Sequence, residues 1–122
     1  MSRRTYVFVS PGDEPAESVI AVIEDVTGRS FIREPGTGSY LADPLAVYVG
    51  SHDFDDGDID FPDGTPVPLR SRYPTLVEVR DTKHDQSRQE AAAARIYAAL
   101  TADRSRKVVL VDDMQHVLQS SS

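Results

Sequence analysis

The stretch Lys107-Val108-Val109-Leu110-Val111-Asp112 decides how the rest of this chain is interpreted, because it places four aliphatic residues in a row. Such a run, bounded by polar residues and too short for a helix, is typical of a central β-strand buried on both faces. A strand of that kind needs other segments to cover it. The chain has 122 residues, the usual size of one domain, so those segments must come from the same domain.

Other strands are predicted from composition and from the residues that interrupt them. Thr75 to Arg80 alternates, with Val77 and Val79 on one face and polar residues on the other, which indicates a strand with one buried face. Three more segments are rich in β-branched or aromatic residues and end at Gly or Pro. They are Thr5 to Ser10, the short Phe31-Ile32 and Leu45 to Val49.

Two segments have helical periodicity. In the first, Asp13 is a suitable N-cap and Gly28 a suitable residue to end the helix, with an apolar stripe between them. The second begins with the capping-box sequence Ser87-Arg88-Gln89-Glu90 and runs to about Ala102. Met114 to Leu118 predicts either a short closing helix or a final strand. The stripe of the first helix consists of Ala16, Val19, Ile20, Ile23 and Val26.

We therefore expect residues 1–122 to form a single α+β domain with the order β-α-β-β-β-α-β and an acidic, Pro/Gly-rich insertion at about residues 51–74. Two one-sided helices on one face of a mainly antiparallel sheet predict a ferredoxin-like sandwich. The alternative is a small open α/β sheet with parallel strands. Neither fold assigns a function by itself.

Composition excludes several classes of protein. The 13 Lys and Arg against 20 Asp and Glu give a net charge of −7, whereas a nucleic-acid binder needs a dense basic face, so we expect no nucleic acid as partner. Without cysteine there is no disulfide, Cys zinc site or thiolate nucleophile. No apolar run is long enough to span a membrane, and the short run after Arg4 is not a secretory signal, so we expect a cytoplasmic protein.

The most unusual segment is His52 to Gly64, which contains no Lys or Arg and concentrates the negative charge of the chain. Once its six Asp are set aside, the remainder has a net charge of −1. Clustered carboxylates attract a basic protein, and interleaved aromatic residues can anchor it. The same apolar residues can instead pin the loop to the core. The predicted partner-binding residues are Asp53, Phe54, Asp55, Asp56, Asp58, Asp60, Phe61 and Asp63.

A metal site or an enzyme is the alternative function. The acidic segment does not fit an EF-hand loop, because Gly57 falls one position early and Gly64 stands where that loop needs Glu. His52 with the loop acids, or the pair Asp112-Asp113 at a strand end, could serve a metal or an acid–base reaction. No nucleophile elbow, P-loop, zinc-protease or dinucleotide motif is present. We therefore predict no catalytic residues, no metal and no cofactor.

In size and charge the chain is similar to bacterial immunity and antitoxin proteins, which block a toxic partner by occupying its basic active site. That resemblance rests on being small, acidic and free of cysteine. It implies a protein-binding module that inhibits a basic partner. A homodimer formed through an exposed sheet face is a further expectation.

Overall fold

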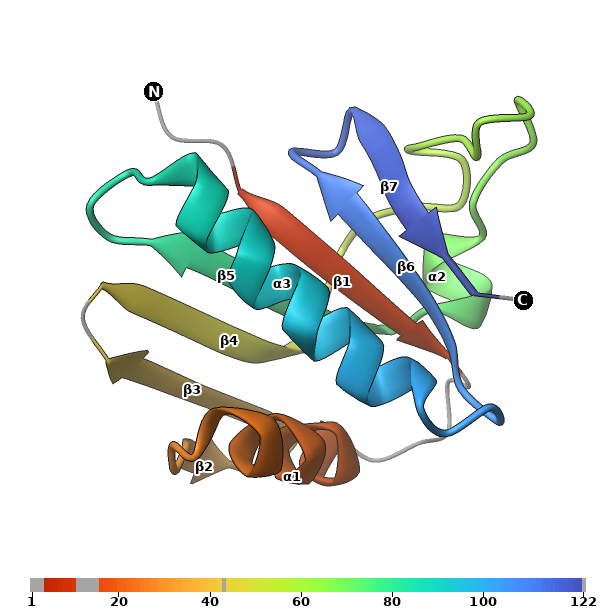
Figure 1. The fold of residues 1–122 in the computed structure, drawn as a ribbon. Coiled ribbons are helices and arrows are strands. Elements are labelled where there is room, and N and C mark those ends of the chain that lie inside the picture. Colours follow the sequence, from red (N-terminus) through yellow and green to blue (C-terminus); the bar gives the residue numbers. More distant parts are fainter. Residues whose placement is uncertain (1–3, 11–15, 43, 122) are drawn as a thin grey trace.

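The computed structural model describes residues 4–10, 16–42 and 44–121. Its strands form one antiparallel sheet in the order β2-β3-β4-β5-β1-β6-β7, shown in Figure 1. The strands are β1 (Thr5–Ser10), β2 (Ile32–Glu34), β3 (Thr37–Ala42), β4 (Leu45–Ser51), β5 (Thr75–Asp81), β6 (Lys107–Asp112) and β7 (His116–Ser120). The helices are α1 (Ala16–Thr27), α2 (Leu69–Arg72) and α3 (Gln86–Thr101).

One face of the sheet is covered by α1 and α3, which lie across it in Figure 1. The buried stripe of α1 is Val19, Ile20 and Ile23, and α3 presents Ala93, Ile96 and Leu100 to the same core. Burying an aliphatic side chain of this kind stabilises the fold by about 1.5–3 kcal/mol. The sheet contributes Val7, Val9, Tyr40, Val47, Val49, Val77, Val79, Val108 and Leu110.

The opposite face is covered over only part of its width. Ile59, Val67, Leu69 and Tyr73 come from the segment between β4 and β5 and pack beneath β1 and β6. They meet the alternate side chains of those strands and of β5, namely Tyr6, Phe8, Leu76, Val109 and Val111. Over β2, β3 and β4 the same face leaves Ile32, Leu41 and Tyr48 exposed.

The α+β class and the antiparallel sheet are confirmed, and β6 is buried on both faces as its sequence predicts. The strand order differs from the ferredoxin-like one, so that topology is not confirmed. Every strand pairing in the described ranges is antiparallel, so the alternative with parallel strands is wrong. None of the helices found in these ranges has the length and apolar character needed to cross a membrane.

The sequence does not predict β3, which forms a hairpin with β2 through a turn at Gly36, where φ is +75°. Small residues weaken the strand pattern of β3, but one of them has a packing reason. A Cβ on Gly38 would lie 2.6 Å from the Cδ1 atom of Ile20, so glycine allows α1 to pack closely over the strand.

Near the end of the chain, the predicted alternative of a final strand is confirmed as β7, and the alternative of a short closing helix is wrong. The turn between β6 and β7 has Asp113 and Met114 at φ of 49° and 57°, the left-handed region that usually requires Gly or Asn. The Asp113 N–H donates to the carbonyl oxygen of Arg4, 2.8 Å away, which ties this turn to the start of β1. Short-range sequence patterns contain no sign of that contact.

The start of α3 shows the limits of cap prediction. In α3 the N-cap is Asp85, which accepts a hydrogen bond from the Arg88 N–H at 3.0 Å, so the predicted cap at Ser87 is wrong by two residues. Both residue types cap well, and the Asp85 N–H is itself bonded to Asp81 at the end of β5. The predicted cap of the first helix, Asp13, lies outside the described residues. At the other end of α1, Gly28 adopts φ of +69°, as predicted for a residue that ends a helix.

Candidate functional site

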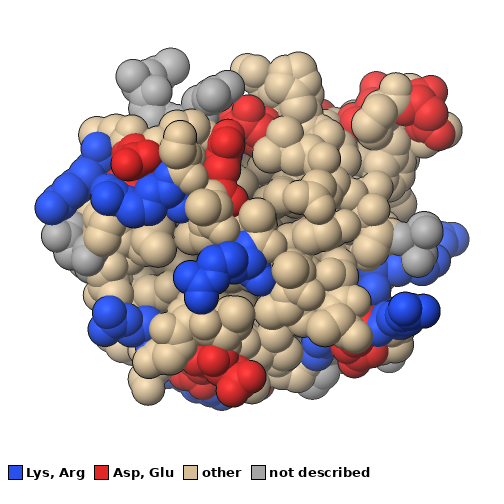
Figure 2. Space-filling view, in the orientation of Figure 1, with Lys and Arg blue, Asp and Glu red and all other residues tan. Residues whose placement is uncertain are grey.

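The segment His52–Gly64, here called the acidic loop, projects from the sheet beside α2 (Figure 1). Acidic side chains gather at the upper right of Figure 2, where this loop extends in the same orientation. All six of its Asp residues are exposed: Asp53, Asp55, Asp56, Asp58, Asp60 and Asp63.

The apolar residues of the acidic loop point the other way, into the core. Ile59 is buried, and Phe54 and Phe61 are half-buried against the same cluster. The Phe54 ring packs edge-on against Tyr6 and Phe8, with ring centres 5.7 and 5.9 Å away. These contacts fix the loop on the sheet and leave part of the Phe54 and Phe61 side chains accessible.

His52 also holds the loop in place. Its Nδ1 atom accepts a hydrogen bond from the Phe54 N–H at 3.0 Å, so the ring proton must be on Nε2. Nε2 then donates to the carbonyl oxygen of Tyr73, 2.7 Å away. Both ring nitrogens are therefore engaged in holding the backbone.

Arg70 ties the acidic loop to α2. Its guanidinium forms an ion pair with Asp55 at 2.7 Å and donates to the carbonyl oxygen of Asp53 at 3.1 Å. Asp56 accepts hydrogen bonds from the Arg70 and Ser71 N–H groups, at 2.8 and 2.9 Å, and so caps the first turn of α2. These bonds, the one from Ser71 above all, lower the pKa of Asp56.

Two further carboxylates stabilise turns within the loop. Asp58 accepts the Asp55 N–H at 2.8 Å. Asp63 accepts the hydroxyl and the N–H of Thr65, at 2.6 and 2.9 Å, and these bonds lower its pKa. Such local bonds are ordinary turn chemistry for Asp, and they leave the charge of the carboxylate in place.

The side chains of Asp53 and Asp60 make no hydrogen bond or ion pair with any residue in the described ranges. Within those ranges, the acidic loop forms one ion pair with a cationic side chain, Asp55 to Arg70. The six predicted acids thus divide into four that shape the loop and two that serve no structural role within it. All of them keep their negative charge near solvent.

A second carboxylate site escaped the sequence analysis. Asp81, at the end of β5, is buried and accepts hydrogen bonds from the Arg88 guanidinium and from the N–H groups of Lys83 and Asp85. The Arg88 bond is the main reason that the pKa of Asp81 lies far below its usual range. Gln89, also buried, accepts the Asp81 N–H at 2.8 Å and donates to Thr5. The alternation that buries Val77 and Val79 continues to Asp81, and that pattern could have revealed it.

The residues considered for a metal site do not form one in the described part of the chain. Within residues 4–10, 16–42 and 44–121, no three His, Asp or Glu side chains are placed to hold a metal ion. His84 and His116 are exposed. Asp112 is buried at the end of β6, and Asp113 lies in the following turn.

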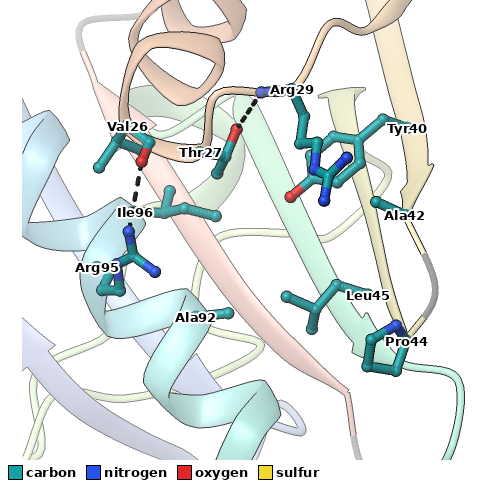
Figure 3. Close-up of a pocket in the computed structure, with 10 residues that line it drawn as sticks. All are labelled: Val26, Thr27, Arg29, Tyr40, Ala42, Pro44, Leu45, Ala92, Arg95 and Ile96. Carbon is teal, nitrogen blue, oxygen red and sulfur yellow. Dashed lines mark hydrogen bonds between the residues drawn. The ribbon is translucent and has the colours of Figure 1, made fainter.

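A pocket on the helix-covered side lies between the end of α1, the middle of α3 and the ends of β3 and β4 (Figure 3). It has a volume of about 220 Å³, and Arg29, Tyr40 and Arg95 are among the residues that line it. The sequence analysis did not single out these residues, because they lie far apart in the chain and belong to no motif.

Comparison with protein-family models, curated proteins and solved structures found no match to this chain. Its function must therefore be argued from its own geometry.

Proposed function

We propose that this protein is a cytoplasmic binding module whose acidic loop contacts a basic protein partner. The observation that carries this proposal is that six exposed carboxylates stand on one ordered loop and form a single ion pair within the described residues. Such a concentration of one sign of charge raises the rate at which an oppositely charged protein is encountered.

The order of the loop supports the proposal. Its shape is set before any partner arrives by Arg70, by the His52 bonds and by hydrogen bonds that join it to the following segment, such as Gly57 N–H to Val67 O at 3.0 Å. A preorganised loop loses less conformational entropy on binding than a flexible one. The accessible parts of Phe54 and Phe61 provide apolar contact beside the charges.

The more specific form of the proposal is inhibition. A loop that presents carboxylates at fixed positions matches the basic cleft of an enzyme that handles a polyanion, and its occupation would block that cleft. This is the mode of action that the similarity to immunity and antitoxin proteins implies.

Charge reversal of Asp53 and Asp60 tests the proposal without disturbing the loop, since neither side chain holds it. We expect Asp53→Lys/Asp60→Lys to bind a basic partner less well than the wild type, mainly because association is slower. The partner would first be captured from cells that express the tagged wild-type protein, with the product of the neighbouring gene tested directly. Association rates would then be measured at low and high salt.

The matched control is Asp25→Lys/Glu34→Lys, which changes the net charge equally on exposed residues far from the loop in sequence. The association rate of the control should be much closer to that of the wild type than the association rate of the loop variant is. Equal association rates and equal salt dependence in both variants would contradict a role for the acidic loop, because bulk charge alone would then explain the binding.

A second candidate is association between copies of the chain. The open half of the sheet exposes Ile32 and Leu41, at 75 % and 70 %, beside Tyr48. Arg4, Glu78 and other residues line a hollow of about 420 Å³ on the same face. We expect Leu41→Asp to lower the mass measured by light scattering at high concentration. A wild-type protein with the mass of one chain at every concentration would contradict it.

We also propose that β4, β5, β1 and β6, which are adjacent in the sheet, form a ferredoxin-like unit together with α1 and α3. The chain order of these elements supports this, since α1 lies between β1 and β4 and α3 between β5 and β6. On that interpretation β2, β3 and β7 are additions at the two edges.

A further inference from the structure

The pocket of Figure 3 combines an apolar wall with two guanidinium groups. Leu45, Ala92 and Ile96 contribute apolar surface, while Arg29 follows α1 and Arg95 stands on α3. The two cations are 66 positions apart in the chain, and only the packing of α1 against α3 and the sheet places them around one cavity. Among the described lining residues there is no Asp or Glu.

The hydrogen-bonding capacity of these arginines is largely unused. Arg95 donates from Nη2 to the carbonyl oxygen of Val26, a long bond of 3.4 Å at the end of α1. The guanidinium of Arg29 forms no hydrogen bond or ion pair with any residue in the described ranges, and only its backbone N–H is bonded, to Thr27. A guanidinium has five N–H donors, so most donors at this site remain available.

Their state contrasts with that of other arginines in the chain. Arg33, Arg70 and Arg88 each form an ion pair with a carboxylate. Arg29 and Arg95 form no ion pair with any described residue, although the chain has a net charge of −7, and both line the same cavity. The site thus has the charge to recognise an anion.

The wall beside Arg29 is preformed (Figure 3). Tyr40 is buried, and its ring packs edge-on against Phe31 with ring centres 4.9 Å apart. Its hydroxyl group lies near the Thr27 side chain, and burial raises the pKa of Tyr40. Thr27 is itself fixed by donation to the Ile23 carbonyl at 2.7 Å.

We propose that this pocket binds a small organic anion, a carboxylate or a phosphate monoester with a short apolar body, through Arg29 and Arg95. Guanidinium groups match carboxylate and phosphate oxygens in geometry as well as charge. The apolar body would lie against Leu45 and Ile96. The volume of about 220 Å³ lies below the roughly 300–1,000 Å³ of pockets that hold drug-sized ligands, which fits a small anion.

This site is separate from the proposed partner-binding loop. The pocket lies on the side of the sheet that α1 and α3 cover, whereas the acidic loop packs against the opposite face. Loss of one function therefore leaves the other measurable.

Titration followed by amide chemical shifts in two-dimensional NMR tests the inference. The probes are benzoate, phenyl phosphate and inorganic phosphate, with benzamide as the uncharged counterpart of benzoate. We expect benzoate or phenyl phosphate to cause saturable shifts at Arg29, Tyr40 and Ile96, and benzamide to bind at least about tenfold more weakly, since charge-assisted bonds are lost. No saturable shift with either organic anion, or equal binding of benzamide, would overturn the proposal.

Variants locate the binding. Arg29→Gln and Arg95→Gln should each weaken binding by about tenfold, and Arg104→Gln, on an exposed residue outside the pocket, should leave it unchanged. Arg29→Gln removes no side-chain hydrogen bond or ion pair within the described residues, so this variant keeps the fold of the wild type. It therefore tests the site even if Arg95→Gln, which removes the bond to Val26, loosens α1. Undiminished binding in Arg29→Gln, or inorganic phosphate binding as tightly as phenyl phosphate, would contradict the site as proposed.

Discussion

Two Asp–Arg ion pairs in this molecule have similar chemistry, but the carboxylate of one is buried and that of the other is exposed. Asp81 and Arg88 join the end of β5 to the first turn of α3, and the Asp81 side chain has an exposed fraction of 0 %. Asp55 and Arg70 join the acidic loop to α2, and the Asp55 side chain is 68 % exposed. The first carboxylate also accepts two backbone N–H groups, whereas the ion pair is the main contact of the second.

The difference shows which acids of the chain are structural. A buried carboxylate loses its hydration, so its removal leaves donors unsatisfied and costs stability. An exposed ion pair contributes little, because water and salt screen it. Asp81 is thus committed to the fold, while the charges of the acidic loop remain available for an interaction with another molecule.

The largest expected effect comes from Asp81→Asn. The amide would turn an N–H group towards the Arg88 guanidinium and remove the charge that balances it, and we expect the melting temperature to fall by about 10 °C. Circular dichroism during heating measures this. Asp103→Asn is the control, since Asp103 is exposed and bonds only within its own turn. A similar melting temperature for both variants would contradict the structural role of Asp81.

The contribution of Asp81 should also depend on pH. Its pKa in the folded state lies below the unfolded value of 3.8, so its stabilising effect is complete above about pH 5 and is lost as the pH falls through the acid range. Urea unfolding at several pH values should show a constant difference in the free energy of unfolding between wild type and Asp81→Asn near neutrality. That gap should narrow below about pH 4. A gap that stays constant down to pH 3 would be evidence against this assignment.

A smaller effect is expected for Asp56→Ala, which removes the acceptor for the Arg70 and Ser71 N–H groups. The loss resembles that of a helix cap, and we expect the melting temperature to fall by a few °C, roughly 2–5 °C. Asp60→Ala, which removes no hydrogen bond within the described residues, should leave the melting temperature unchanged. If the two variants have the same melting temperature, Asp56 does not stabilise α2.

The smallest effect on stability is expected for Arg70→Gln. Because the Asp55–Arg70 pair is exposed, the melting temperature should change by less than about 2 °C. The loop itself should become more mobile, with faster hydrogen exchange at the Gly57 N–H, which is bonded to Val67. Unchanged exchange at Gly57 would contradict a role of the Arg70 side chain in ordering the loop.

Some of the fold was predictable because local patterns and tertiary packing agree. The strand β5 and the helix α1 bury the face that their apolar spacing indicates, and β6 is buried on both faces, as its continuous aliphatic run indicates. The segments of β1, β4 and α3 were predicted from composition and from capping or chain-breaking residues. The strand β3 was missed because its glycine serves a contact with Ile20 that is distant in sequence. The strand β7 was left undecided because the turn before it lacks the glycine that would mark a hairpin.

The candidate site was only partly accessible to sequence reasoning. The concentration of six Asp in His52–Gly64 is a property of the sequence, and their role in binding stays a prediction. The division between acids that shape the loop and acids that do not depends on Arg70, Ser71 and Thr65, whose positions relative to the loop only the structure gives. No local sequence pattern marks the residues that line the Arg29–Arg95 pocket.

The sequence by itself determined the α+β class, the central buried strand and the local excess of negative charge, because each follows from composition and spacing along the chain. Only the tertiary structure decided the strand order, the burial of Asp81 and the meeting of Arg29 with Arg95 at one pocket. The physical reason is that periodicity fixes which face of an element is apolar, whereas its neighbours are chosen by contacts between residues far apart in the chain.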